Sequence, residues 1–214
     1  AIGIVLDSYV YNEIDADITK VTEIIEIPIF RDIGFTCNIH RIDHHYAHSL
    51  SFWPLGIEPT SNFGFDGFGD DWMYRSVWRG DKLIDSCKSN GQMIHYSSSL
   101  GFIMSRLGLV LKMGGNYLDH AGKVMALKAF GQQNDDVVPV DHIDDLKDMW
   151  DFKVIESHLS DQQYVIDYLA TAHEYTEQIY LKHFREYIKP DDIVGYSGGI
   201  AQNTIINKVL KAAI

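Results

Sequence analysis

Hydrophobic residues in the second half of the chain recur every three or four positions, the period of a helix with one buried face. Leu100, Ile103 and Leu107 set this pattern near the start of that half, and Pro190 ends a longer stripe. The pattern predicts four helices: residues 98–111, 122–130 and 161–188, and a last one with Ile205, Ile206, Val209 and Leu210 on one face.

Shorter apolar runs, separated by turn residues, predict strands. Three of them are joined by turns rich in glycine and aspartate, which predicts a three-strand meander: residues 62–65, 72–78 and 82–87. A further strand is expected at residues 193–196. The first 60 residues predict a mixture of short strands and helices, and the aspartate-rich residues 132–151 predict a surface excursion. The elements together predict an α/β protein.

Composition narrows the class of protein. The 214 residues are 46% hydrophobic, enough for one large domain or two lobes with a core. The net charge of −12 argues against nucleic acid and anionic membrane surfaces, which both require basic residues. Cys37 and Cys87 form no close-spaced motif, and the longest apolar runs are too short to span a bilayer. We therefore expect a cytoplasmic protein with neither nucleic acid nor membrane as a partner.

Both ends of the sequence fall inside apolar patterns. Ala1 begins a strand-like run, and Ile214 lies in the stripe of the last predicted helix. Since domains rarely begin and end inside buried elements, we expect the sequence to be a piece of a longer protein.

The densest group of candidate functional residues is Asp-His-His-Tyr-Ala-His at residues 43–48. His44 and His48 are four positions apart, so a helix would place both imidazoles on one face, within reach of one metal ion. Imidazole suits iron, zinc and similar metals. The alternative is a set of surface or hydrogen-bonded histidines, and the spacing alone does not identify a third ligand.

A glycine-rich turn follows the first strand of the predicted meander. Gly67 and Gly69 would let the backbone approach a phosphate, and the flanking Asp66 and Asp70 could hold a cation. The alternative is an exposed turn, because glycine and aspartate favour turns in any case.

Two more features could bind phosphate. Ser-Gly-Gly at residues 197–199 lies between a predicted strand and helix, where free N–H groups favour an anion. Lys123, near a predicted helix start, could neutralise phosphate charge. The alternatives are a tight turn and an exposed helical lysine.

Taken in order, these segments resemble the O-carbamoyltransferase family that includes nodulation and antibiotic-tailoring enzymes. The resemblance covers about residues 40–210 and is carried by five segments: residues 43–49, 66–70, 99–101, 122–131 and 197–203. It implies an actin-like ATPase (ribonuclease H-like) fold, incomplete in this sequence. Residues 1–60 would form part of a first lobe that carries the histidine motif, and residues 61–214 a second lobe truncated at its C-terminal end.

The resemblance also implies an activity. In this family, carbamoyl phosphate and ATP form a carbamoyl-adenylate in a separate C-terminal domain, and the carbamoyl group then passes to a hydroxyl of a small molecule in the metal-containing domain. The metal would be divalent, iron rather than zinc. The implied site residues are these: metal ligands His44, His48 and Asp66; nucleotide or phosphate contacts Gly67, Gly69, Gly198, Gly199 and Asn203; catalytic groups Asp70 as a base and Lys123.

The sequence departs from the family pattern in several places. Asp70 stands where a glutamate is usual, residues 116–121 look inserted, and the phosphate loop of the family's N-terminal strand pair is not recognisable. A further metal ligand and the adenylate-forming domain would lie beyond Ile214. We therefore expect the isolated chain to be inactive.

Three other functions stay open: a different actin-like phosphotransferase, a tRNA threonylcarbamoyl transferase, and a non-enzymatic metal-binding domain. The acidic charge weighs against tRNA. The pair of His44 and His48 weighs against a plain kinase, which needs no such site.

Overall fold

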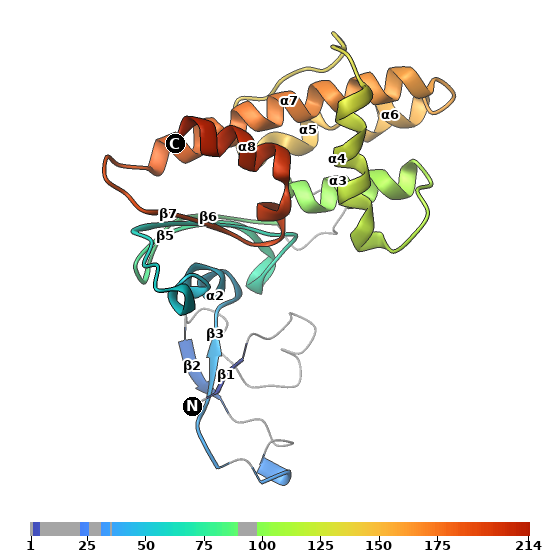
Figure 1. Cartoon of the computed structure of the whole chain (residues 1–214). Helices are drawn as coiled ribbons and strands as arrows, with labels where there is room; N and C mark the ends of the chain where they lie inside the picture. Colours follow the sequence, from blue (N-terminus) through green and yellow to red (C-terminus); the bar gives the residue numbers. More distant parts are fainter. Residues whose placement is uncertain (1, 5–21, 26–30, 35, 90–97) are drawn as a thin grey trace. The chain divides into compact units, whose positions relative to one another are not determined.

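The computed structural model describes residues 2–4, 22–25, 31–34, 36–89 and 98–214 (Figure 1). The chain divides into two compact units. Unit 1 comprises residues 1–91 and 192–198, and unit 2 comprises residues 92–191 and 199–214. These units cut the chain at other places than the lobes expected from the sequence, and the lobe boundary at residue 60 stays a prediction.

Unit 1 begins with a small three-stranded sheet of order β1-β3-β2. Strand β1 (Ile2–Ile4) runs parallel to β3 (Ile39–Ile42), and β2 (Thr22–Ile25) runs antiparallel to it. Helix α2 (His44–Leu50) follows β3 directly, and a short 3-10 helix at Trp53–Leu55 comes next. The mixture of strands and helices expected in the first 60 residues is confirmed for the part of it that the structure describes.

The larger sheet of unit 1 has the order β6-β5-β4-β7. Strands β4 (Ser61–Phe65), β5 (Met73–Arg79) and β6 (Lys82–Lys88) form the predicted antiparallel meander. The predicted fourth strand, β7 (Val194–Ser197), pairs in parallel with β4. Strand β4 is therefore central, and all five of its residues are buried.

Unit 2 is helical. It contains α3 (Leu100–Val110), α4 (His120–Leu127), α5 (Leu146–Met149), α6 (Phe152–Ser157), α7 (Gln162–Tyr187) and α8 (Thr204–Ala213). The four helices predicted from the hydrophobic period are confirmed as α3, α4, α7 and α8. Asp161 caps the start of α7, since its side chain accepts a hydrogen bond from the Tyr164 amide at 3.1 Å.

The surface excursion predicted for residues 132–151 is wrong at its C-terminal end. Leu146, Met149 and Trp150 are fully buried, and the Trp150 indole donates a hydrogen bond to Thr176 at 3.0 Å. Acidic residues, most of them exposed, separate the apolar positions in this stretch. The sequence therefore shows no clear helical period here, although a short helix forms.

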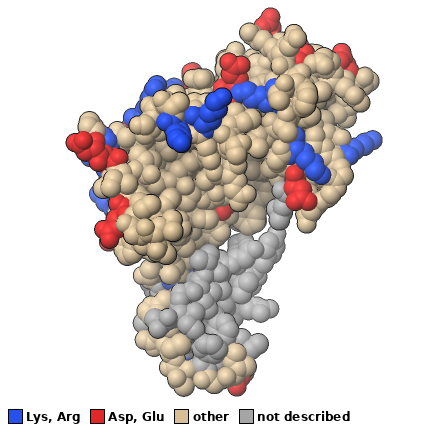
Figure 2. All heavy atoms as spheres, in the orientation of Figure 1, with Lys and Arg blue, Asp and Glu red and all other residues tan. Residues whose placement is uncertain are grey.

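The charged side chains of the described residues are scattered on the face drawn in Figure 2, with Lys and Arg in small groups and Asp and Glu between them. No helix in the described part of the chain is long and apolar enough to cross a membrane.

Candidate metal centre

Helix α2 begins where Asp43 turns the chain out of strand β3. The Asp43 carboxylate accepts a hydrogen bond from the Tyr46 amide at 2.8 Å, a typical helix N-cap. The helix places His44 and His48 one turn apart on one face, as the spacing predicts. Asp66 directly follows strand β4.

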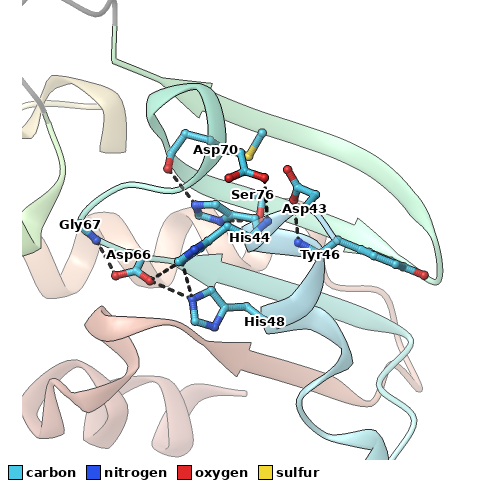
Figure 3. A network of polar contacts seen from close by, with 10 residues as sticks. Asp43, His44, Tyr46, His48, Asp66, Gly67, Asp70 and Ser76 are labelled. Carbon is cyan, nitrogen blue, oxygen red and sulfur yellow. Dashed lines mark hydrogen bonds and ion pairs between the residues drawn. The ribbon is translucent and has the colours of Figure 1, made fainter. Parts of the chain in front are cut away.

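These elements bring together three side chains (Figure 3). Asp66 Oδ2 lies 3.0 Å from His44 Nε2 and 2.8 Å from His48 Nε2, and the two imidazole nitrogens are 3.2 Å apart. Each side chain keeps about a quarter of its surface exposed. Among the residues that the structure describes, this is the only group of three potential metal-binding side chains.

The electrostatics of the three groups favour an anionic Asp66. Burial alone raises the pKa of its carboxyl group, but hydrogen bonds to both imidazoles and to the Gly67 amide outweigh burial and hold the pKa well below its usual range. The hydrogen bond to Asp66 raises the pKa of His44 against the opposing effect of burial. Asp66 can therefore act as an ionised ligand at neutral pH.

The distances fit a metal ion. Ligand atoms about 2.0–2.2 Å from a common metal lie roughly 2.8–3.6 Å apart in octahedral or tetrahedral geometry. The three observed separations, 2.8, 3.0 and 3.2 Å, lie within this range. Two imidazoles and one carboxylate on one side of a site are typical of non-haem Fe(II), and zinc also accepts these ligands.

Comparison with known proteins decides the family. The family model described as carbamoyltransferase N-terminus matches residues 8–160, which include all three of these side chains. The chain belongs to the carbamoyltransferase family. No curated protein and no solved structure matches it. The family expected from the ordered segments of the sequence is thus confirmed.

Two other predicted residues lie beside the three side chains. Gly67 donates its backbone N–H to Asp66 Oδ1 at 2.7 Å. A Cβ atom at Gly69 would come within 2.6 Å of the His45 ring and 3.0 Å of the His44 ring. Their role in phosphate binding stays a prediction, but Gly69 already has a structural reason to be glycine.

Asp70 lies in a charged, buried environment. Its Oδ2 atom accepts hydrogen bonds from Arg41 at 2.6 Å and from the backbone N–H of His44 at 3.2 Å, and both Arg41 and Asp70 are buried. Asp70 therefore helps to hold the start of α2. Its role as a catalytic base stays a prediction.

Gly198 belongs to the same unit as Asp66. Because Ser197 pairs with Gly64, the turn after β7 leaves the sheet at the same edge as Asp66 after β4. Gly198 has a φ angle of +94°, and a Cβ atom there would lie 2.1 Å from the Phe65 carbonyl oxygen. Only glycine fits this position.

The remaining predicted residues lie in unit 2. Lys123 is exposed on α4, and its amine donates to the Gly114 carbonyl. Gly199 opens a 3-10 turn before α8. The Asn203 side chain is buried and caps α8 by accepting hydrogen bonds from two backbone amides at 3.1 Å. Roles in catalysis or nucleotide binding stay predictions for all three.

Two buried residues that contribute to the contacts around α2 were not predicted from the sequence. Arg41 is fully buried in strand β3, whose two central residues are polar, so no apolar pattern marked it as buried. His45 belongs to the motif, but it is off the four-residue spacing of His44 and His48, so the spacing assigns it no role. Burial lowers the pKa of His45 to about 4, so its imidazole is neutral at pH 7.

Proposed function

We propose that this chain supplies the metal-binding part of an enzyme that transfers a carbamoyl group to a hydroxyl of a small molecule. The donor would be carbamoyl phosphate, converted with ATP into a carbamoyl-adenylate by a further domain. The convergence of His44, His48 and Asp66 within 3.2 Å of one another carries the proposal, and the family match supports it.

A divalent ion held by these three side chains, iron rather than zinc, would supply a Lewis acid that polarises the carbamoyl carbonyl. The three ligand side chains would together carry one negative charge, because Asp66 is ionised and both histidines bind as neutral imidazoles. Three protein ligands leave coordination positions for a substrate, and the partial exposure of the three side chains gives it access.

The transfer forms a bond between the acceptor oxygen and the carbamoyl carbon and breaks the bond to the adenylate phosphate. The acceptor proton must pass to a base. Asp70 is the proposed base, and it would have to leave its ion pair with Arg41 to take that proton. Lys123 is proposed to neutralise phosphate charge.

The glycines at the sheet edge support a phosphate-bearing ligand near the ion. Ligands of α/β proteins commonly bind beyond the carboxyl ends of neighbouring parallel strands. Asp66 directly follows the carboxyl end of β4, and Gly198 directly follows that of the parallel strand β7. We propose that Gly67 and Gly69 contact phosphate and that Gly198, Gly199 and Asn203 contact the nucleotide, as the family resemblance implies for an actin-like ATPase fold.

Metal content tests the proposal. The chain is purified without oxygen, supplied with Fe(II), and analysed by elemental mass spectrometry beside a His44→Ala/His48→Ala double variant. His142→Ala, an exposed histidine of unit 2, is the matched control. We expect about one metal per chain in the wild type and in the control, and none in the double variant. A wild-type chain that takes up no metal, or a double variant that keeps it, would contradict the proposal.

A further inference from the structure

His45 differs from the two histidines that flank it in the motif. His44 and His48 turn toward Asp66, whereas the His45 side chain is fully buried. Both of its ring nitrogens have partners: Nε2 lies 2.9 Å from the Met73 carbonyl oxygen, and Nδ1 lies 3.0 Å from Ser76 Oγ. Both partners belong to strand β5.

The hydrogen bonds around His45 have a fixed direction. A carbonyl oxygen only accepts, so Nε2 carries the proton and donates to Met73. Nδ1 of the neutral ring is then an acceptor, and the Ser76 hydroxyl donates to it. The Trp78 indole N–H donates in turn to Ser76 Oγ at 2.9 Å. The chain from Trp78 through Ser76 to His45 is fully satisfied and carries no charge.

This chain joins the two parts of the candidate metal centre. Helix α2 carries His44 and His48, while Asp66 is fixed at the end of β4. Strand β4 pairs directly with β5, where Gly64 is opposite Ser76. His45 therefore ties the helix with two of the ligands to the sheet that positions the third.

The space around the His45 ring is tight. A Cβ atom at Gly64 would lie 2.8 Å from Ser76 Oγ and 3.1 Å from His45 Nδ1. A Cβ atom at Gly69 would lie 2.6 Å from the same ring on its Cδ2 side. Close packing on two sides and hydrogen bonds at both nitrogens leave the ring one position, and so fix the rotation of α2 relative to the sheet.

We propose that His45 is a positioning residue of the metal centre: through Met73 and Ser76 it sets the separation between the two histidine ligands and Asp66, and thereby the affinity and geometry of the bound ion. This inference rests on the proposed metal site. The competing explanation is that His45 only fills the core of unit 1.

Binding of Co(II) distinguishes the two explanations, because the visible absorption of this ion reports the ligand geometry. His45→Phe keeps a planar buried ring and removes both hydrogen bonds. We expect it to lower Co(II) affinity at least tenfold and to shift the absorption bands, as the loss of outer-shell support does in other metal sites. The affinity comes from a titration, and urea unfolding of the metal-free protein measures stability.

Val77→Ala is the matched control. Val77 lies on the same strand and is buried, but it points to the opposite side of the sheet from Ser76 and Trp78. It should lower stability and leave Co(II) affinity and absorption unchanged. If His45→Phe and Val77→Ala weaken Co(II) binding equally, or if His45→Phe binds Co(II) like the wild type, the positioning role is wrong.

Ser76→Ala guards against a His45→Phe variant that does not fold. It keeps the imidazole and removes only the hydroxyl that donates to Nδ1. A two- to fivefold loss of Co(II) affinity is expected, with a smaller spectral shift. Unchanged binding in Ser76→Ala would contradict the inference. A wild-type chain that binds no Co(II) would overturn the proposed metal site itself. If the wild type and every variant bind Co(II) equally well, only the positioning role of His45 is overturned.

Discussion

His45 in unit 1 and His173 in unit 2 are both buried, but their imidazoles have different hydrogen-bond partners. Both have hydrogen-bond partners at both ring nitrogens. His45 contacts a carbonyl and a hydroxyl, whereas His173 Nδ1 lies 3.0 Å from Glu177 Oε1 and its Nε2 lies 3.2 Å from Asn203 Nδ2. One network is neutral, and the other contains a carboxylate.

The orientation of Asn203 fixes the network in unit 2. Its Oδ1 atom accepts hydrogen bonds from the first amides of α8, so its NH₂ group faces His173 Nε2. His173 therefore donates from Nδ1 to Glu177, which also pairs with Lys128. Burial raises the pKa of Glu177, but its hydrogen bonds to His173 and Lys128 outweigh burial and lower it.

The comparison teaches what each network is sensitive to. The network in unit 2 holds opposite charges together and ties α7 to α8, so removing a charge should damage it most. The network around His45 holds no charge and depends on shape and direction. Substitutions in the two networks test this difference.

Glu177→Ala should have the largest effect, because it leaves Lys128 and His173 without their shared acceptor. We expect a loss of about 2 kcal/mol in the free energy of unfolding, less than for a fully buried pair since Lys128 is partly exposed. Urea unfolding measures it. Glu174→Ala, on an exposed position of the same helix, should change stability by less than about 0.5 kcal/mol. Equal losses in the two variants would contradict the role of the network.

Ser76→Ala should cost less, about 1 kcal/mol of unfolding free energy, because it breaks a neutral hydrogen-bond chain. The indole of Trp78 and Nδ1 of His45 would each lose a partner in a buried place. Urea unfolding under the same conditions gives the comparison. A loss larger than that of Glu177→Ala would reverse our ranking of the two networks.

The pH dependence of the stability of Glu177→Gln, compared with that of the wild type, should show what the charge of Glu177 contributes. The folded state binds a proton at Glu177 less readily than the unfolded chain does, since the pKa is lowered from 4.5. The resulting stability is fully present above that pH and is lost as the pH falls below it. The difference in unfolding free energy between the wild type and Glu177→Gln should therefore shrink as the pH falls below 4.5. A constant difference would show that the charge of Glu177 contributes nothing.

Substitution of His120 is expected to raise the free energy of unfolding, unlike the substitutions above. It is buried at the start of α4, and neither ring nitrogen has a hydrogen-bond partner among the described residues. His120→Leu removes these unpartnered atoms, so we expect a gain of about 1 kcal/mol in unfolding free energy. Thermal unfolding should show a higher midpoint, and a lower midpoint would mean that His120 has a favourable contact in solution.

The sequence predicted the parts of this fold that depend on local periodicity. The stripe of α7 and the turns of the meander were sufficient to find those elements. The pairing of β7 with β4 was not predictable, because periodicity says nothing about which strand a segment joins. Leu146 and its neighbours were missed because exposed charges break up a short helical pattern.

The candidate site was predictable to a similar degree. The spacing of His44 and His48 fixes their common face once a helix forms. The glycine-rich turn marked Asp66 as a residue that could hold a cation, but only the family resemblance placed it with the two histidines. The role of His45 could not be found in the same way. It depends on a carbonyl and a hydroxyl of β5, some thirty residues away in the chain, which no local motif encodes.

The position of β7 has a consequence for how the protein is made. Its Asp192 end is joined to Thr60, Ser61 and Arg79 by hydrogen bonds of 2.8–3.1 Å, across at least 113 residues of sequence. A ribosome synthesises all of the first part of unit 2 before this strand appears. The half of the protein that carries the histidine cluster therefore remains one strand short, with an open edge at β4, while the helices around α7 can already fold. Helices whose contacts are local can fold early. Because α8 also follows β7 in the chain, however, both units can be completed only after residue 192 has been synthesised.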